Sequence, residues 1–157
     1  MEAQCRAVAS ASGVMVAPQQ RAMLWRLALG VLAMEAEEEN NCCELESKTD
    51  AYYALQEDLM PTLEKAKADP LNEGWTAYHQ SLELEEFIKG DLNRLYLNGI
   101  EDDFFHTEYR QKVLSNVLML WCMQHTETSY RQGMHEIAAP ILWVIETELE
   151  YYTTTGE

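Results

Sequence analysis

The residues that could do chemistry in this chain are few, and no familiar self-contained catalytic motif joins them. The sequence holds no Gly-x-x-x-x-Gly-Lys loop for phosphates, no Gly-x-Ser-x-Gly nucleophile turn and no His-Glu-x-x-His pair. His125 and His135 lack a third ligand at helical spacing, so we expect no metal site. The four cysteines form no Cys-x-x-Cys pair, which favours reduced thiols. We therefore expect the chain to bind neither nucleotide nor metal by itself.

Three short patterns are each common by chance, but their order and separations along the chain are informative. They are Arg21-Ala-Met-Leu-Trp25, Ile88-Lys-Gly-Asp91-Leu-Asn-Arg94 and Tyr130-Arg-Gln132-Gly133-Met134. In this order and with these separations they resemble the TBC-domain GTPase-activating proteins, which act on Rab GTPases. The resemblance covers about residues 69–144, and residues 132–141 are similar to one member of that family in particular.

This resemblance implies an all-α fold, the N-terminal part of a TBC-type domain with about five helices. It also implies a mechanism in trans, in which Arg94 is an arginine finger and Gln132 a glutamine finger that enter the nucleotide site of a GTP-loaded Rab. GTP and magnesium would be bound by that Rab, so no cofactor is expected on this chain. By the same resemblance, the remaining motif residues have supporting or structural roles: Arg21, Trp25, Ile88, Asp91, Tyr130 and Gly133.

Elementary chemistry agrees with the two fingers. Phosphoryl transfer responds mainly to positioning and to neutralisation of charge on the phosphate oxygens, and a planar guanidinium suits that charge better than a lysine ammonium. Asp91 and Arg94 are spaced i, i+3, so the carboxylate can restrict the arginine. Gln132 can orient a water through its amide, and Gly133 after it permits a tight turn.

Plainer interpretations of the same residues remain open. Without the resemblance, Arg94 is a solvated cation at a helix end and Gln132 a surface residue. Arg21 and Trp25 at i, i+4 can pack the arginine stem on the indole as scaffold. An acidic helical protein with three coincidental matches is the weakest alternative.

The sequence departs from the family pattern in two places. The family usually has threonine and then proline after the finger arginine, whereas Leu95, Tyr96 and Leu97 follow here. The sequence also stops at Glu157, soon after Gln132, so we expect the N-terminal half of the domain. Both departures motivate a second hypothesis: a truncated or degenerate TBC module that binds a Rab or a trafficking adaptor without stimulating hydrolysis.

The elements that must position these residues can be read from apolar spacings of three and four. These spacings predict helices over residues 18–32, 47–61, 84–98, 113–121 and 134–145, with Pro61 ending or kinking the second and Pro140 inside the last. Asn98-Gly99 is the expected stop of the third, and Asp69-Pro70 closes the section before it. We expect residues 1–17 to be a loose extension, residues 35–46 an exposed acidic connection, and residues 18–157 a partial domain.

Composition excludes several functions. Twenty-seven acidic residues face 11 basic ones, a net charge of −16, which argues against nucleic acid as a partner. The apolar run at residues 27–34 is far shorter than the roughly 20 residues of a membrane span. We therefore expect a cytoplasmic protein, which the resemblance suggests is recruited to endosomal or autophagic membranes by its partners.

Overall fold

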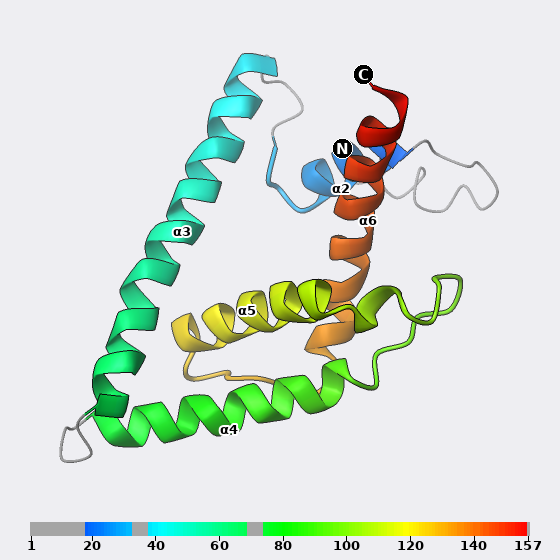
Figure 1. The fold of residues 1–157 in the computed structure, drawn as a ribbon. Helices are drawn as coiled ribbons and strands as arrows, with labels where there is room; N and C mark the ends of the chain where they lie inside the picture. The colour runs from blue at the N-terminus through cyan, green and yellow to red at the C-terminus, as the bar shows by residue number, and fades with distance from the viewer. Residues whose placement is uncertain (1–17, 33–37, 69–73, 157) are drawn as a thin grey trace. The chain divides into compact units, whose positions relative to one another are not determined.

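The computed structural model describes residues 18–32, 38–68 and 74–156. Within them all regular structure is helical and no strand occurs, so the predicted all-α fold is confirmed. The elements are α2 (Pro18–Ala28), α3 (Glu38–Ala68), α4 (Gly74–Leu92), the short 3₁₀ helix η1 (Phe104–His106), α5 (Glu108–Gln124) and α6 (Met134–Thr155), drawn in Figure 1. The extension expected over residues 1–17 lies outside the described residues.

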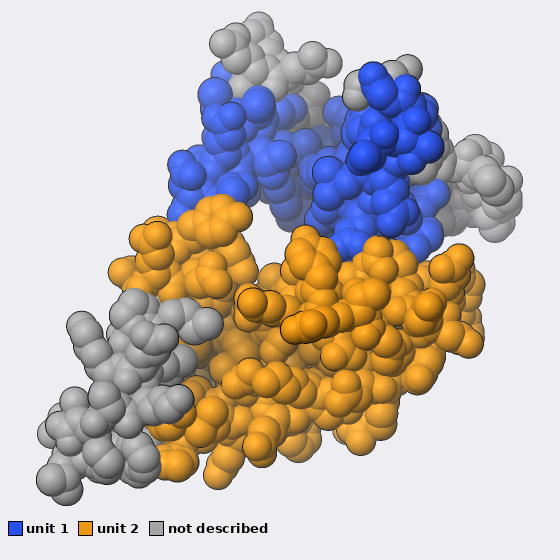
Figure 2. Space-filling view, in the orientation of Figure 1, with its two compact units in different colours: residues 1–50, 141–157 blue, residues 51–140 orange. Residues whose placement is uncertain are grey.

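The chain divides into two compact units, which are coloured separately in Figure 2. The first unit consists of residues 1–50 and 141–157, and the second of residues 51–140. Helices α3 and α6 contribute residues to both units. Arg94 and Gln132 therefore belong to the second unit, whereas Arg21 and Trp25 belong to the first.

The second unit is built on α4 and α5, which lie side by side and antiparallel, with η1 against α5 (Figure 1). Ile88, Leu92 and Leu95 are buried at spacings of four and three residues, which places them on one face of α4 and the turn after it. The buried residues that complete this core are Phe105, Leu114, Leu118, Leu120, Cys122 and Ala139.

Helix α5 contains the helix predicted over residues 113–121, but the face that it buries differs from the predicted one. The sequence pattern included Val117 and Trp121, and both are exposed in the structure. Leu114, Leu118 and Cys122, each four residues apart, are buried instead. Residues four apart lie on the same face of a helix, so these three residues define the buried face of α5. Contact with α4 decides which apolar residues of α5 are buried.

Helix α2 ends earlier than predicted. The pattern extended through residue 32, but α2 stops at Ala28 and Gly30 adopts a positive φ of 70°. The N–H of Val31 donates to the carbonyl of Arg26 at 2.8 Å, and the N–H of Gly30 to that of Leu27 at 3.2 Å. This pair of bonds is the Schellman arrangement, in which glycine closes a helix at low steric cost.

Helix α3 departs from the predicted boundaries at both ends. The acidic connection expected over residues 35–46 is helical from Glu38 onward, although the side chains of residues 42–46 are exposed. Glutamate is a good helix former, so solvated charge does not prevent a helix. The helix also continues past Pro61 to Ala68, because an interior proline costs about 3 kcal/mol without forbidding helix on either side. The break expected at Asp69-Pro70 lies outside the described residues.

Helix α4 ends at Leu92 and not at the predicted stop, Asn98-Gly99. The N–H of Arg94 donates to the carbonyl of Asp91 at 3.0 Å, and the N–H of Leu95 to that of Leu92 at 3.2 Å. These three-residue bonds tighten the chain into turns. Leu95 thus keeps its place on the apolar face although the helix has ended.

In the first unit, α2 packs against the C-terminal part of α6. Ala22 and Val144 are buried there. One interpretation of the sequence packs the Arg21 stem on Trp25 as scaffold. In the structure the Arg21 guanidinium lies over the ring of Trp143, 4.8 Å from the ring centroid. Trp25 is exposed. A cation over an indole face is favourable, so Arg21 ties the two helices together.

A bidentate ion pair also joins α2 and α6. Arg26 donates from Nη1 to Glu148 Oε1 at 2.9 Å and from Nη2 to Oε2 at 2.6 Å. The Glu148 side chain is largely buried. Paired geometry of this kind is stronger than a single contact between exposed charges.

We expect Glu148→Gln to lower the free energy of unfolding by about 1–3 kcal/mol, because Arg26 loses a charged partner in a partly dry setting. Urea denaturation followed by far-ultraviolet circular dichroism measures this loss. Arg26→Met provides the second corner of a double-mutant cycle, and the double variant should lose less than both single variants together. Strictly additive losses would contradict the pairing.

Candidate functional site

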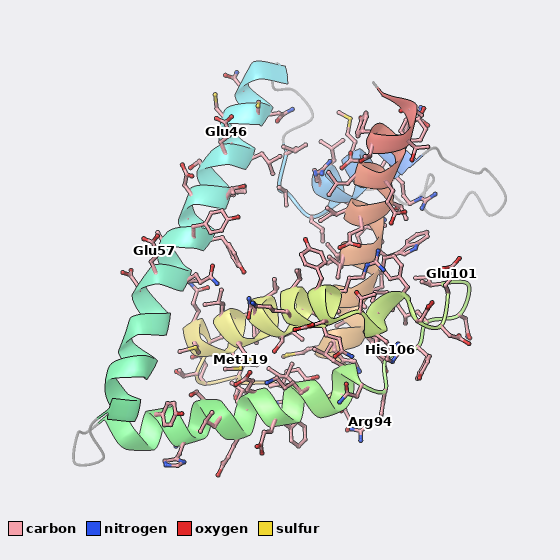
Figure 3. The ribbon with its side chains drawn as sticks, viewed as in Figure 1. Glu46, Glu57, Arg94, Glu101, His106 and Met119 are labelled. Atoms are coloured by element: carbon pink, nitrogen blue, oxygen red, sulfur yellow. The ribbon has the colours of Figure 1, made fainter. Side chains whose placement is uncertain are left out.

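Arg94 lies just beyond the end of α4, where Figure 3 labels its side chain. Its side chain is 73% exposed, whereas Leu92 and Leu95 on either side are each 2% exposed. The backbone of this turn is therefore anchored in the core while its one cationic side chain is presented to solvent.

The carboxylate of Asp91 restrains that side chain. Arg94 Nη2 donates to Asp91 Oδ1 at 2.8 Å, the contact that the i, i+3 spacing predicts. Asp91 itself is only 3% exposed. An exposed arginine is thus held at its base by a buried anion, which reduces the number of rotamers it samples.

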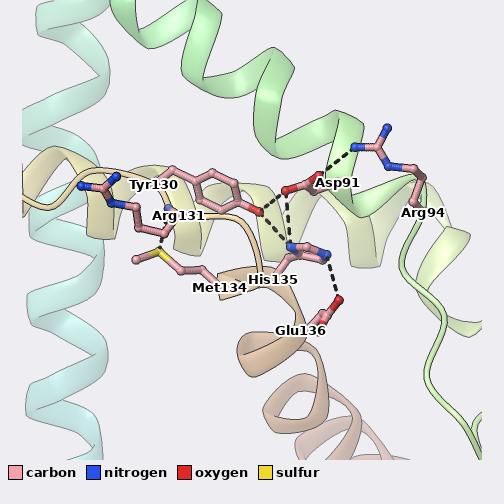
Figure 4. Close-up of polar contacts among 7 residues, drawn as sticks. All are labelled: Asp91, Arg94, Tyr130, Arg131, Met134, His135 and Glu136. Atoms are coloured by element: carbon pink, nitrogen blue, oxygen red, sulfur yellow. Dashed lines mark hydrogen bonds and ion pairs between the residues drawn. The ribbon is translucent and has the colours of Figure 1, made fainter.

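The other oxygen of the same carboxylate reaches the segment before α6. The Tyr130 hydroxyl donates to Asp91 Oδ2 at 2.9 Å and also lies 2.8 Å from His135 Nδ1 (Figure 4). His135 Nδ1 is 3.6 Å from Asp91 Oδ2, and its ring is buried. Four side chains from two distant parts of the sequence therefore form one polar cluster, which we call the Asp91 cluster: Asp91, Arg94, Tyr130 and His135.

Electrostatics within the Asp91 cluster favour a charged aspartate and a neutral tyrosine. Burial by itself raises the pKa of Asp91, but hydrogen bonds from Arg94 and Tyr130, with nearby His135, outweigh burial and lower it below the ordinary value. Burial, and then the hydrogen bond to the Asp91 anion, raise the pKa of Tyr130 well above its ordinary value. At neutral pH Asp91 is therefore an acceptor only, and Tyr130 keeps its proton.

Gln132 occupies a tight turn directly before α6. Gly133 has a φ of 99°, a conformation that side-chain-bearing residues rarely adopt, so glycine is needed there as predicted. The N–H of Met134 donates to the carbonyl of Arg131 at 3.1 Å and closes the turn. Gln132 is exposed. Its amide is therefore presented to solvent from a well-defined backbone.

The structure brings part of the predicted site together. Tyr130 lies two residues before Gln132, so the contact of Tyr130 with Asp91 joins the segment of Gln132 to the segment of Arg94. Ile88 is fully buried on the inward face of α4, in keeping with a structural role. Arg21 and Trp25 belong to the first unit and do not enter the Asp91 cluster.

The sequence does not indicate one contributor to the cluster. His135 shows no pattern there beyond a metal site that it cannot complete, yet it is 6% exposed and bonded within the cluster. Leu95 belongs to the apolar pattern that predicts the helix over residues 84–98, and its burial anchors the turn of Arg94. Within the described residues, no group of three or more potential metal ligands converges.

The chain belongs to the Rab-GTPase-TBC domain family, whose sequence profile matches residues 18–155. The resemblance stated from the three motifs is thereby confirmed. Among the described helices, none is both long and apolar enough to cross a membrane.

Its relatives include the particular member to which residues 132–141 are similar. TBC1 domain family member 5 of Homo sapiens is 31% identical over 83 residues, which cover 53% of this chain and 10% of the relative. TBC1 domain family member 5 homolog B of Dictyostelium discoideum is 27% identical over 143 residues, 87% of this chain and 14% of the relative. TBC1 domain family member 17 of Homo sapiens is 26% identical over 140 residues, 87% of this chain and 20% of the relative. The chain thus spans a fifth or less of these curated relatives, and no solved structure matches it.

We expect Tyr130→Phe to lower the free energy of unfolding by about 1–3 kcal/mol, because Asp91 and His135 each lose a partner in a buried setting. Urea denaturation provides the measurement. Tyr109→Phe, at an exposed tyrosine of α5, is the matched control and should change stability by less than about 0.5 kcal/mol. Equal stability of the two variants would show that the Asp91 cluster is not stabilising.

The pH dependence of stability should report the lowered pKa of Asp91. A carboxyl whose pKa is lower in the folded state stabilises the fold above its unfolded value, near 4, and loses this effect as pH falls through the folded value. The stability advantage of wild type over Asp91→Asn should therefore be largest near pH 7 and shrink between about pH 5 and pH 2. Urea denaturation at a series of pH values tests this, and a constant difference would contradict it.

Proposed function

We propose that this chain carries the finger residues of a Rab GTPase-activating protein, which stimulates GTP hydrolysis in trans. One observation carries the proposal: the exposed guanidinium of Arg94 is held by buried Asp91, which also binds Tyr130, two residues before exposed Gln132. The two candidate fingers are thus tied to one buried anion. Membership of the Rab-GTPase-TBC domain family supplies the Rab as partner.

The chemistry asks for little more than these two side chains. Arg94 neutralises negative charge that develops on the phosphate oxygens in the transition state, with a permanently charged and planar donor set. Gln132 accepts a hydrogen bond from the attacking water and orients it without changing its own protonation. An arginine finger contributes about 10³–10⁵ in rate, which corresponds to roughly 4–7 kcal/mol of barrier.

The remaining components come from the partner. GTP and magnesium are bound by the Rab, so this chain needs no cofactor. It acts in the cytoplasm and is brought to endosomal or autophagic membranes by its GTPase or by a trafficking adaptor. The net charge of −16 disfavours nucleic acid as a partner.

A second candidate function is Rab or adaptor binding without stimulated hydrolysis. It is favoured by Leu95, which stands where the family usually has threonine. Titration with a panel of GTP-loaded Rabs, with binding and phosphate release both measured, separates the two functions. Binding without phosphate release would favour this second function.

The main test uses Arg94→Ala and Gln132→Ala. We expect Arg94→Ala to reduce stimulated hydrolysis by about 10³-fold or more, and Gln132→Ala to abolish most of it, because charge neutralisation and water placement are lost. Single-turnover phosphate release measures the rate, and circular dichroism should show unchanged helix content. Lys112→Ala and Gln124→Ala, at exposed positions of α5, are matched controls that should keep the wild-type rate. Full activity in both finger variants would defeat the proposal.

A charge-preserving substitution tests why arginine is needed. Arg94→Lys keeps the positive charge but loses the planar fork that meets both Asp91 and a phosphate. We expect its rate to stay close to that of Arg94→Ala in the same assay. Recovery of the wild-type rate would mean that charge alone is sufficient.

A further inference from the structure

The hydrogen bonds of the Asp91 cluster have a defined direction. The Tyr130 hydroxyl oxygen lies 2.9 Å from Asp91 Oδ2 and 2.8 Å from His135 Nδ1 (Figure 4). An ionised carboxylate can only accept, so the single hydroxyl hydrogen of Tyr130 points to Asp91. The hydroxyl oxygen must then accept from His135, which requires a hydrogen on Nδ1. The donors therefore run from His135 to Tyr130 and from Tyr130 to Asp91.

The two residues of the first of these hydrogen bonds, His135 and Tyr130, lie on either side of the turn that contains Gln132. Tyr130 precedes Gln132 by two residues and His135 follows it by three, so their hydrogen bond ties the two ends of the turn together. Asp91 Oδ1 binds Arg94 at the same time. A carboxylate is a rigid plane, so a partner that fixes one oxygen also fixes the direction of the other. The orientation of Arg94 thus depends on what holds Tyr130.

We propose that His135 is a positioning residue for both candidate fingers, acting through its Nδ1–H bond to the Tyr130 hydroxyl. The inference rests on the proposed function and assigns that function a residue outside the two fingers. His135 is 6% exposed, so water does not compete freely for Nδ1. The acidic groups near its ring are Asp91, 3.6 Å from Nδ1, and Glu136, 4.0 Å from Nε2. Asp91 lies on the same side as Tyr130 and reinforces a donor at Nδ1.

Two amide substitutions separate positioning from simple packing. In His135→Asn the amide nitrogen can take the place of Nδ1, whereas in His135→Gln the longer side chain carries the amide toward the place of Nε2. We expect His135→Gln to lower kcat of the GTP hydrolysis that this chain stimulates on a Rab by about 10–100-fold, with KM for the GTP-loaded Rab changed by less than about threefold. His135→Asn should stay within about threefold of wild type in both constants.

A double variant tests whether His135 acts through Tyr130. Tyr130→Phe removes the hydroxyl, so adding His135→Gln to it should cause no further loss of kcat. Urea denaturation of every variant separates lost folding from lost orientation. Equal kcat for His135→Gln and wild type would overturn the proposal. So would equal losses in His135→Asn and His135→Gln, or additive losses in the double variant.

A nitrogen NMR spectrum of the His135 ring tests the hydrogen-bond direction without any GTPase. A hydrogen on Nδ1 is expected, and a ring protonated only on Nε2 would overturn the inference whatever the kinetics. If wild-type protein stimulates no Rab, the proposed function fails and the catalytic part of the inference falls with it. The spectrum then still decides how the Asp91 cluster is bonded, so the two failures are distinguishable.

Discussion

The buried carboxylate of Asp91 holds together the candidate site of the second unit, because it contacts Arg94, Tyr130 and His135. An anion that is 3% exposed must be paired or hydrogen-bonded, because leaving it unsatisfied in a dry setting costs several kcal/mol or more. Asp91 meets this requirement with Arg94 on one oxygen and Tyr130 on the other. Its partners come from the end of α4 and from the turn before α6, which are far apart in sequence. One buried carboxylate therefore joins the end of α4 to the turn before α6.

A side chain that works on a partner must be exposed and yet well placed, and the turn after α4 satisfies both conditions. Leu92 and Leu95 are buried on either side of Arg94, so the backbone there cannot shift without opening the core. The Arg94 side chain is 73% exposed, so its charge loses little of its hydration. Leu95, where the family resemblance leads us to expect threonine, anchors the turn by its burial. Burial of one leucine is worth about 1.5–3 kcal/mol, enough to fix a short turn that lacks a rigid proline.

The sequence was informative wherever interactions are local. Helices α5 and α6 were predicted from apolar spacing, and the Asp91–Arg94 contact from its i, i+3 separation, because helix geometry determines both. The sequence did not predict the features that depend on contacts between residues far apart in the chain. The inward face of α5 depends on α4, the ring beneath Arg21 comes from α6, and the bond from Tyr130 to Asp91 joins residues 39 apart. His135 was missed because Gly133 breaks the helical period between it and Tyr130. Helix α3 continues past Pro61, so the low helix propensity of proline did not predict where this helix ends.

The net charge of −16 constrains how such a site could meet a nucleotide. A strongly acidic chain does not attract phosphates at long range, but charges farther apart than about 8 Å are largely screened at physiological salt. What a bound phosphate meets is therefore the local surface. There the exposed Arg94 guanidinium stands beside an Asp91 carboxylate whose charge is already shared with Tyr130 and is turned inward. Affinity for a GTP-loaded partner would then come from short-range fit, and Arg94 would contribute only after docking, when water has been expelled and its charge is no longer screened.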